Sequence, residues 1–428
     1  MPPERRPSWL RALVAVIVID MVGSGLYLPV SLLYFTKVAG ISLTTTGLCL
    51  SAAQLVSLPL PLLVGRLVDR YGARAVVLGG LLLEGAGFFG YLFVSGTGVL
   101  LATACLAAIG QRAYWSSIFT LIADLTSSAE RDHAYAVSSA AQNAGVGVGA
   151  LLAAGLLAIG DESAFRLVIG LNAATFALSA LVLWLRVPRR AHQHELQPGV
   201  GEPTSTSADG EGHSAGGPLR DRPFVLLVAA NTVFALCSVV LGLGLPVFAD
   251  AVLGHATWVV GVLLGLNTAG LALCQTAVVR RLSGRRRTRV LVVAGLSWTG
   301  WGILMATLLA IPVAWVVLAL FPVTVLYTVA ELLHAPTSMA LASHVGPDRL
   351  RGRYLSTFQF SFALALIVGP TLFTQLFSWN HAAPWLVTAA LAAAAGMLVL
   401  ALESRLPAAA VTAPGAATGG TAKDLAGT

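Results

Sequence analysis

The chain has 428 residues, of which 57% are hydrophobic and only 11% are charged, and its formal net charge is +7. A typical soluble domain has about 25% charged residues, and water could not solvate so apolar a surface, so the composition excludes an ordinary soluble protein. The basic residues stand in short blocks between apolar runs, which indicates membrane topology and argues against a nucleic-acid-binding surface.

The apolar runs predict twelve membrane-spanning helices, because about 20 apolar residues cross a bilayer. In chain order they cover residues 12–36, 43–65, 75–95, 98–123, 134–160, 165–185, 223–249, 256–279, 290–312, 313–343, 355–378 and 383–402. The ninth and tenth runs are separated only at Pro312, where proline favours a tight turn. The four cysteines lie inside apolar runs without a CxxC or Cys/His cluster, so we expect no disulfide framework, metal site or cofactor.

An even number of spans places both termini on one side of the membrane. If that side is the cytoplasm, 23 of the 26 Lys and Arg residues fall in cytoplasmic loops and tails, all except Lys37, Arg112 and Arg166. This asymmetry follows the positive-inside rule. We therefore expect a multi-pass protein of the inner or plasma membrane with both termini in the cytoplasm. We also expect it to function as a monomer.

One long polar stretch divides the spans into two groups of six. Residues 186–222 have no apolar periodicity and predict a disordered cytoplasmic linker. The expected domains are a six-helix bundle at 1–185 and a second at 223–403. The segment 404–428 is rich in Ala, Gly and Thr and predicts a disordered cytoplasmic tail.

The two halves carry a short sequence repeat. GLYLPV at 25–30 resembles GLGLPV at 242–247. Further along, a Val-x-Gly ending at Gly40 or Gly254 is followed seven residues later by Gly47 or Gly261. Duplicated halves are typical of secondary transporters.

The loop after the second span reads GRLVDRYGAR at residues 65–74. It resembles the G-x-x-x-D-R-x-G-x-R/K signature of the major facilitator superfamily, in the same loop, and the resemblance covers nearly the whole chain. It implies an all-α membrane protein of twelve transmembrane helices in two pseudo-symmetric six-helix halves.

The same resemblance implies a cytoplasmic gate. The acid would meet a helix N-terminus of the other half, and the arginines would make ionic contacts that latch an outward-open state. The alternative is that these charges only set topology. The equivalent loop at 281–287 lacks the acid. The gate residues are Gly65, Asp69, Arg70, Gly72 and Arg74.

Further residues resemble multidrug transporters of this family. Arg112 resembles the arginine that drug/proton antiporters carry in the fourth helix. The segment 143–149 of the fifth helix has the glycines of the antiporter motif but not its proline, and close helix packing also explains them. Glu331, Pro336 and RGRY at 351–354 resemble the second-half pattern of multidrug-resistance-like members.

Charged residues in the middle of apolar runs each cost about 2.5–3.5 kcal/mol on insertion scales, so each needs a partner or a cavity. Helices 1, 4, 7 and 10 line the central cavity of the family fold, and they carry Asp20, Arg112 and Glu331. We expect Asp20 and Arg112 to pair, with Asp20 exchanging a proton for substrate; a static structural pair is the alternative. Glu331 is the second candidate proton carrier, with His334 as a relay or a buried hydrogen-bonded neighbour. Glu84 lies on a peripheral helix, where we expect a structural role.

Aromatic and amide side chains complete the expected cavity, which suits a moderately hydrophobic substrate. The alternative is that the aromatic residues only pack or lie at the membrane interface. These additional candidates are Tyr27, Gln111, Tyr114, Trp115, Asn143, Asn231, His334 and Gln359.

The sequence favours a proton-coupled exporter of small hydrophobic molecules, such as drugs or metabolites, that works by alternating access. A proton-linked importer on the same fold is the first alternative, and the missing proline of the fifth helix is its main support. A non-transporting receptor or an intramembrane enzyme is the second. The chain has no P-loop, G-x-S-x-G elbow or HExxH, so we expect neither ATP-driven transport nor enzyme activity.

Overall fold

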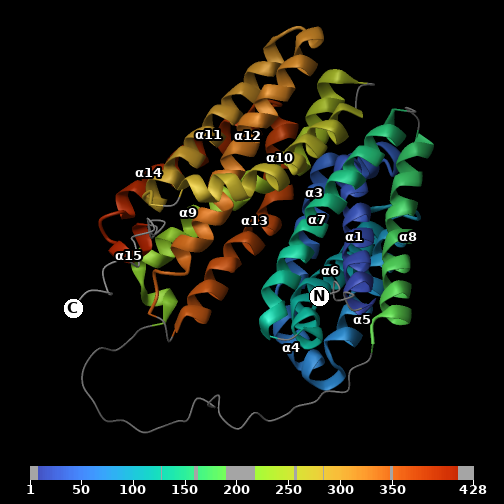
Figure 1. The fold of residues 1–428 in the computed structure, drawn as a ribbon. Helices are drawn as coiled ribbons and strands as arrows, with labels where there is room; N and C mark the ends of the chain where they lie inside the picture. The colour runs from blue at the N-terminus through green and yellow to red at the C-terminus, as the bar shows by residue number, and fades with distance from the viewer. Residues whose placement is uncertain are drawn as a thin grey trace, which may run out of the picture.

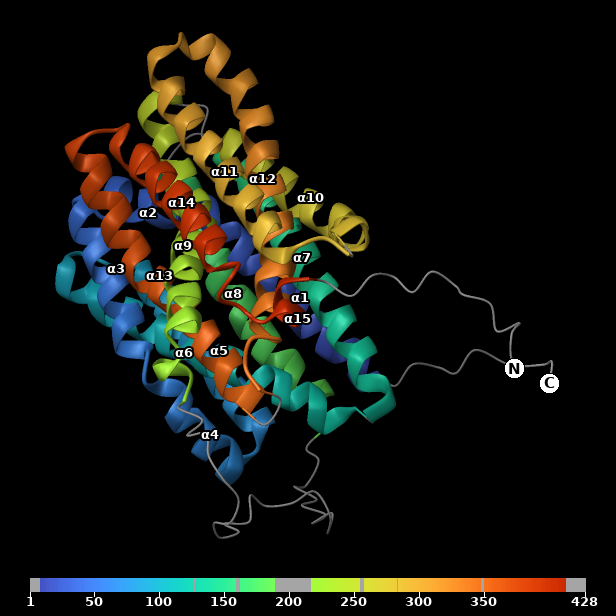
Figure 2. The same ribbon diagram turned by 90° about the vertical axis from the view of Figure 1, so that its left-hand side faces the viewer.

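The computed structural model describes residues 8–126, 128–158, 162–188, 217–254, 258–282, 284–347 and 350–412. Two groups of long helices lie side by side, one from each half of the chain (Figure 1). They converge toward one end and separate toward the other, where α4 lies (Figures 1 and 2). This is the expected all-α architecture of two helical halves.

The N-terminal half begins with a span that changes its winding. Helix α1 (Ser8–Tyr27) continues through a 3₁₀ turn at Leu28–Val30, α2 (Ser31–Leu33) and a π-helical segment at Tyr34–Val38. Pro29 lies in the 3₁₀ turn, where its missing N–H is tolerated. The remaining helices of this half are α3 (Leu43–Ser57), α4 (Leu60–Tyr71), α5 (Ala73–Tyr91), α6 (Thr97–Leu125), α7 (Ser128–Leu157) and α8 (Glu162–Arg186).

The C-terminal half follows the same plan. Its helices are α9 (Arg222–Leu253), α10 (Trp258–Leu282), α11 (Arg287–Thr307), α12 (Val313–Ala342), α13 (Arg351–Trp379), α14 (Ala383–Leu402) and the short α15 (Ala408–Val411). Pro312 stands directly before α12, as the sequence predicts for the ninth and tenth spans.

Each of the twelve predicted spans corresponds to one helix or to consecutive helical segments. Ten segments of the described chain are long and apolar enough to cross a membrane, and α3 with α4, bent by 47° near Leu58 and Pro59, makes an eleventh. The remaining long helix is α6, whose 29 residues include Gln111 and Arg112. These polar side chains reduce its apolar character without shortening the helix.

The backbone conformation reproduces the sequence repeat. Among the described residues, the glycines with positive φ fall into two pairs: Gly40 (66°) with Gly254 (58°), and Gly72 (82°) with Gly284 (78°). Each pair occupies corresponding turns of the two halves. Left-handed backbone favours glycine because other residues pay a steric cost there.

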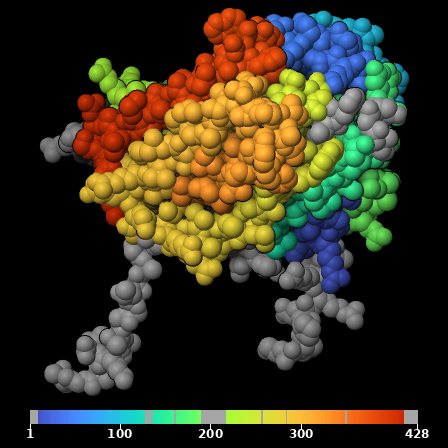
Figure 3. Space-filling model, turned by 90° about the horizontal axis from the view of Figure 1, so that it is seen from above, coloured from blue at the N-terminus to red at the C-terminus, as the bar shows by residue number. Residues whose placement is uncertain are grey.

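A second pair of repeated glycines brings the halves together. A Cβ on Gly47 of α3 would lie 2.0 Å from Thr374 Oγ1 and 2.7 Å from the Pro370 carbonyl of α13. A Cβ on Gly261 of α10 would lie 2.3 Å from the Ala150 carbonyl of α7. Both crossings lie at the end opposite α4, where the two halves adjoin in the view from above (Figure 3). Small residues thus permit close helix contact on this side.

The beginning of the expected disordered tail is ordered. Ala410 and Val411 of α15 are buried, and Arg287 Nη1 donates to the Ala410 carbonyl at 2.8 Å. Just before it, Glu403 accepts from Thr288 Oγ1 at 2.6 Å and pairs with Arg286. The hydrogen bond from Thr288 lowers the pKa of Glu403 most, and the contact with Arg286 lowers it further. The tail residues find partners because α11 begins with basic and hydroxyl side chains. Residues 189–216 of the expected linker and 413–428 of the tail lie outside the described residues.

Candidate functional site

A cavity of about 490 Å³ lies between the two halves. Its volume falls in the usual range for small-molecule sites, about 300–1,000 Å³. Most of its lining is apolar, and the two charged residues of the lining are Glu84 and Glu331. The lining residues are Tyr27, Leu28, Ser31, Leu50, Ala53, Gln54, Glu84, Phe88, Tyr91, Ala104, Ala107, Ala108, Gln111, Asn143, Val146, Ser238, Val239, Leu241, Gly242, Leu243, Leu264, Asn267, Thr268, Leu271, Tyr327, Glu331, Leu366 and Pro370.

Four of the predicted site residues line this cavity: Tyr27, Gln111, Asn143 and Glu331. The sequence does not single out other polar members of the lining, among them Gln54, Tyr91 and Tyr327. Neutral amides and phenols inside apolar runs are common, so only their place in the fold distinguishes them. Glu84 differs, since an acid within a span is already a functional signal.

Glu331 is the centre of a polar cluster in the C-terminal half. Asn267 Nδ2 of α10 donates to Glu331 Oε2 at 2.8 Å, and Tyr327 OH donates to Oε1 at 3.3 Å. Asn267 Nδ2 also donates to Thr328 Oγ1 at 3.1 Å, and the single hydroxyl proton of Tyr327 is shared between Glu331 Oε1 and the nearer Ser238 carbonyl of α9 at 2.8 Å. These contacts hold the carboxyl group at the cavity wall and connect α12 with α9 and α10.

His334 belongs to a different environment from Glu331. Its Nε2 is 2.8 Å from Asn231 Oδ1, and Asn231 Nδ2 donates to Ser361 Oγ at 2.6 Å. Phe234 and Trp298 rings pack against the imidazole. His334 and Asn231 are each 2% exposed and are absent from the cavity lining. The structure therefore favours the buried hydrogen-bonded arrangement over a relay to Glu331.

Asp20 does not form the expected pair with Arg112. Asp20 is 2% exposed, and its carboxyl group interacts with the Tyr114 side chain. Arg112 instead points its Nη2 toward Gln54 Oε1, at 3.5 Å. Side chains two positions apart on an α-helix point in directions about 200° apart around the helix axis. When α6 directs Tyr114 toward Asp20, Arg112 points away from Asp20. In the described conformation Arg112 therefore does not act on the carboxyl group of Asp20.

Glu84 lies where three glycines bring α5 and α6 into backbone contact. A Cβ on Gly110 would be 2.4 Å from the Glu84 backbone nitrogen, and one on Gly80 would be 2.8 Å from that of Tyr114. One on Gly87 would be 2.6 Å from the nitrogen of Ala107. Glu84 is 4% exposed and lines the cavity, so the third membrane span, α5, is not peripheral at this point.

Two remaining candidates lie away from the cavity lining. Trp115 packs beside Tyr114 with ring centroids 5.5 Å apart and beside Phe119 at 6.3 Å. Gln359 is exposed on α13. The packing alternative accounts for Trp115.

The loop motif is arranged within its own half. Gly65, Asp69 and Arg70 are exposed, and Arg70 lies over the Tyr71 ring, 5.3 Å from its centroid. Gly72 makes the turn between α4 and α5 with positive φ.

Arg74 contacts the end of α8. Its Nε donates to the Val187 carbonyl at 2.9 Å and its Nη2 to the Trp184 carbonyl at 2.8 Å. Arginine at a helix C-terminus satisfies carbonyls that lack intrahelical partners.

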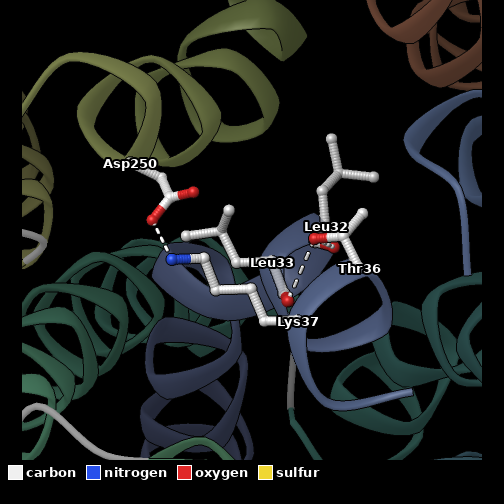
Figure 4. Close-up of polar contacts among 5 residues, drawn as sticks. All are labelled: Leu32, Leu33, Thr36, Lys37 and Asp250. Atoms are coloured by element: carbon white, nitrogen blue, oxygen red, sulfur yellow. Dashed lines mark hydrogen bonds and ion pairs between the residues drawn. The ribbon is translucent and has the colours of Figure 1, made fainter. Parts of the chain in front are cut away.

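An ion pair joins the halves at the end opposite the motif. Lys37 Nζ contacts Asp250 Oδ1 of α9 (Figure 4). Thr36 Oγ1 donates to the Leu32 and Leu33 carbonyls at 3.3 and 3.2 Å, within the same turn (Figure 4). In the sequence Lys37 stands only as an exception to the charge asymmetry, because no local pattern connects it with a residue 213 positions later.

Comparison with known proteins agrees with this geometry. The sequence model described as Major Facilitator Superfamily matches residues 13–370. The chain is 25% identical over 395 residues to "Multidrug resistance protein MdtH" of Edwardsiella ictaluri, covering 89% of this chain and 90% of that protein. It is 27% identical over 369 residues to the protein of that name from Aeromonas hydrophila subsp. hydrophila, covering 86% of each.

Solved structures share the fold. The nucleoside transporter NupG is similar with a TM-score of 0.71 at 11% identity, over 93% of this chain and 99% of that one. The peptide transporter POT in complex with sulfate is similar with a TM-score of 0.70 at 14% identity, over 93% and 95%. With the family model matching most of its length, the chain belongs to the Major Facilitator Superfamily.

Proposed function

We propose that the protein is a proton-coupled exporter of small hydrophobic molecules that works as a monomer in the inner or plasma membrane. The observation that carries the proposal is the inter-half cavity, which combines a mainly apolar wall with the acid Glu331. The curated relatives named as multidrug resistance proteins support export of varied compounds. Both termini face the cytoplasm in this proposal.

The described conformation then faces the cytoplasm. Lys37–Asp250 and the two glycine crossings would lie on the extracellular side, where they seal the cavity. The exposed Asp69 would meet the other half only after the cytoplasmic ends close. The two bundles, 1–185 and 223–403, would rock as units around the cavity, as transporters with repeated halves do.

We assign proton exchange to Glu331 in place of Asp20. Glu331 faces the cavity, so water or substrate reaches its carboxyl group, whereas Asp20 is 2% exposed and absent from the lining. Its two hydrogen-bond donors hold the carboxylate after the proton leaves. Substrate entering beside it would change this environment and favour proton release.

Flux in proteoliposomes tests the proposal. A pH gradient is imposed across vesicles holding the full chain, and uptake is measured for a panel of hydrophobic compounds. We expect substrate movement opposite to proton flow, lost in Glu331→Gln and retained in Glu162→Gln, which neutralises an exposed acid on α8. Movement in the same direction as protons would support the importer. Proton-driven transport that persists in Glu331→Gln would refute the assignment of the carrier.

A further inference from the structure

The face of α5 that meets the cavity carries an acid beside aromatic rings. Glu84, Phe88 and Tyr91 are spaced by four and three residues, which places them on one helix face, and all three line the cavity. Tyr27 of α1 joins them: its ring is 4.8 Å from that of Phe88 and 6.3 Å from that of Tyr91, centroid to centroid. Phe88 and Tyr91 are 5.1 Å apart. Three aromatic rings thus surround one side of the cavity next to a carboxyl group.

The two acids of the cavity differ in their partners. Both oxygens of Glu331 accept hydrogen bonds, from Asn267 and from Tyr327. Within the described part of the chain, no hydrogen bond to the Glu84 carboxyl group and no ion pair of Glu84 is found, and Arg112 is directed to Gln54. The titratable neighbours of Glu84 are the acid Asp20 and the phenols Tyr91 and Tyr114, none of which is a cation.

An ionised carboxylate that is buried in a low-dielectric wall without a neighbouring cation has a high free energy. A positively charged ligand would lower that free energy, and no protein cation competes with it for the carboxylate. Aromatic faces add attraction for ammonium groups, and quaternary ammonium recognition uses such rings. No Lys, Arg or His belongs to the described cavity lining, so nothing there repels a positive ligand.

We propose, on the basis of the transport function above, that Glu84 is a specificity-determining residue that binds the positive centre of an organic cation, with Tyr27, Phe88 and Tyr91 around its apolar substituents. Glu331, at the facing wall of the C-terminal half, keeps the proton role. The two acids therefore serve different ligands, and the charge preference of the site depends on Glu84.

Two ions of nearly equal shape and opposite charge test this assignment. Tetraphenylphosphonium and tetraphenylborate are measured for binding to the full chain in nanodiscs at pH 8, which favours ionised carboxyl groups, with protein-free nanodiscs subtracted. We expect the wild type to prefer the cation. Glu84→Gln should weaken cation binding about tenfold or more and reduce the preference, whereas Glu84→Asp should restore part of it. Glu162→Gln is the matched control, and a thermal melt of each variant checks folding.

Several results would overturn the proposal. These are unchanged cation binding in Glu84→Gln, a preference lost in Glu331→Gln but kept in Glu84→Gln, and equal affinity of the wild type for both ions. The measurement is of binding, so it stands apart from the flux experiment. A wild type that prefers the cation through Glu84 but moves no compound with protons would refute only the transport function.

Discussion

The crossing of α10 with α7 gives a direct way to disturb the equilibrium between conformations. In Gly261→Ala the new Cβ would lie 2.3 Å from the Ala150 carbonyl oxygen and 2.6 Å from Ala154 Cβ. Ordinary contact begins at 3.4 Å, so the methyl group is more than 1 Å too close. A backbone carbonyl cannot rotate away as a side chain can, and the helices must separate.

The expected magnitude follows from overpacking. Inserting a methyl group into a close-packed contact costs typically about 1–3 kcal/mol, which corresponds to roughly a 5–150-fold change in an equilibrium constant. The cost applies only while α7 and α10 touch. Gly261→Ala should therefore depopulate the described conformation by about that factor while leaving each half folded.

Spin-label distances measure the shift. Labels at Ser95 and Asn380, exposed near the ends of the two halves that adjoin, report their separation. We expect Gly261→Ala to move the distance distribution toward longer values. Gly155→Ala on α7 is the control, because a Cβ there meets nothing within 4 Å. An unchanged distribution in Gly261→Ala would show that this contact does not hold the halves together.

The remaining predictions concern the two ends of the bundle. Lys37→Glu should weaken the closure of the two halves at the Lys37–Asp250 end by up to about 1 kcal/mol, since the pair is partly exposed. Adding Asp250→Lys should restore the spin-label distance distribution, and a double variant that does not recover it would exclude pairing as the cause. Asp69→Asn should slow transport without lowering the melting temperature, because Asp69 is exposed in the described conformation. Its helix-terminus contact, worth up to about 2 kcal/mol, would form only when the cytoplasmic ends close. Wild-type turnover in this variant would contradict a gate role. An impermeant thiol reagent added outside cells should label a cysteine at Asn380 and not one at Arg285, and the reverse pattern would invert the topology.

The sequence alone determined the features that depend on short stretches of chain. Apolar length and charge placement predict the spans, because transfer into lipid is summed over neighbouring residues. Pro312 and the paired glycines at 40 and 254 follow from backbone sterics that act within a turn. The motif at 65–74 identified the family from its residue types and location, and the match over residues 13–370 confirms it.

Tertiary structure decided which polar groups meet. The charges of Asp20 and Arg112 predict a pair, yet the rotation of α6 places Tyr114 at Asp20. Glu84 reaches the cavity because glycines bring α5 against α6, and Lys37 meets Asp250 because the two halves close at that end. The direction of a side chain around its helix axis depends on how that helix packs against its neighbours. The residue types of an apolar run that faces lipid, protein and cavity in turn do not show which side chain faces which of them.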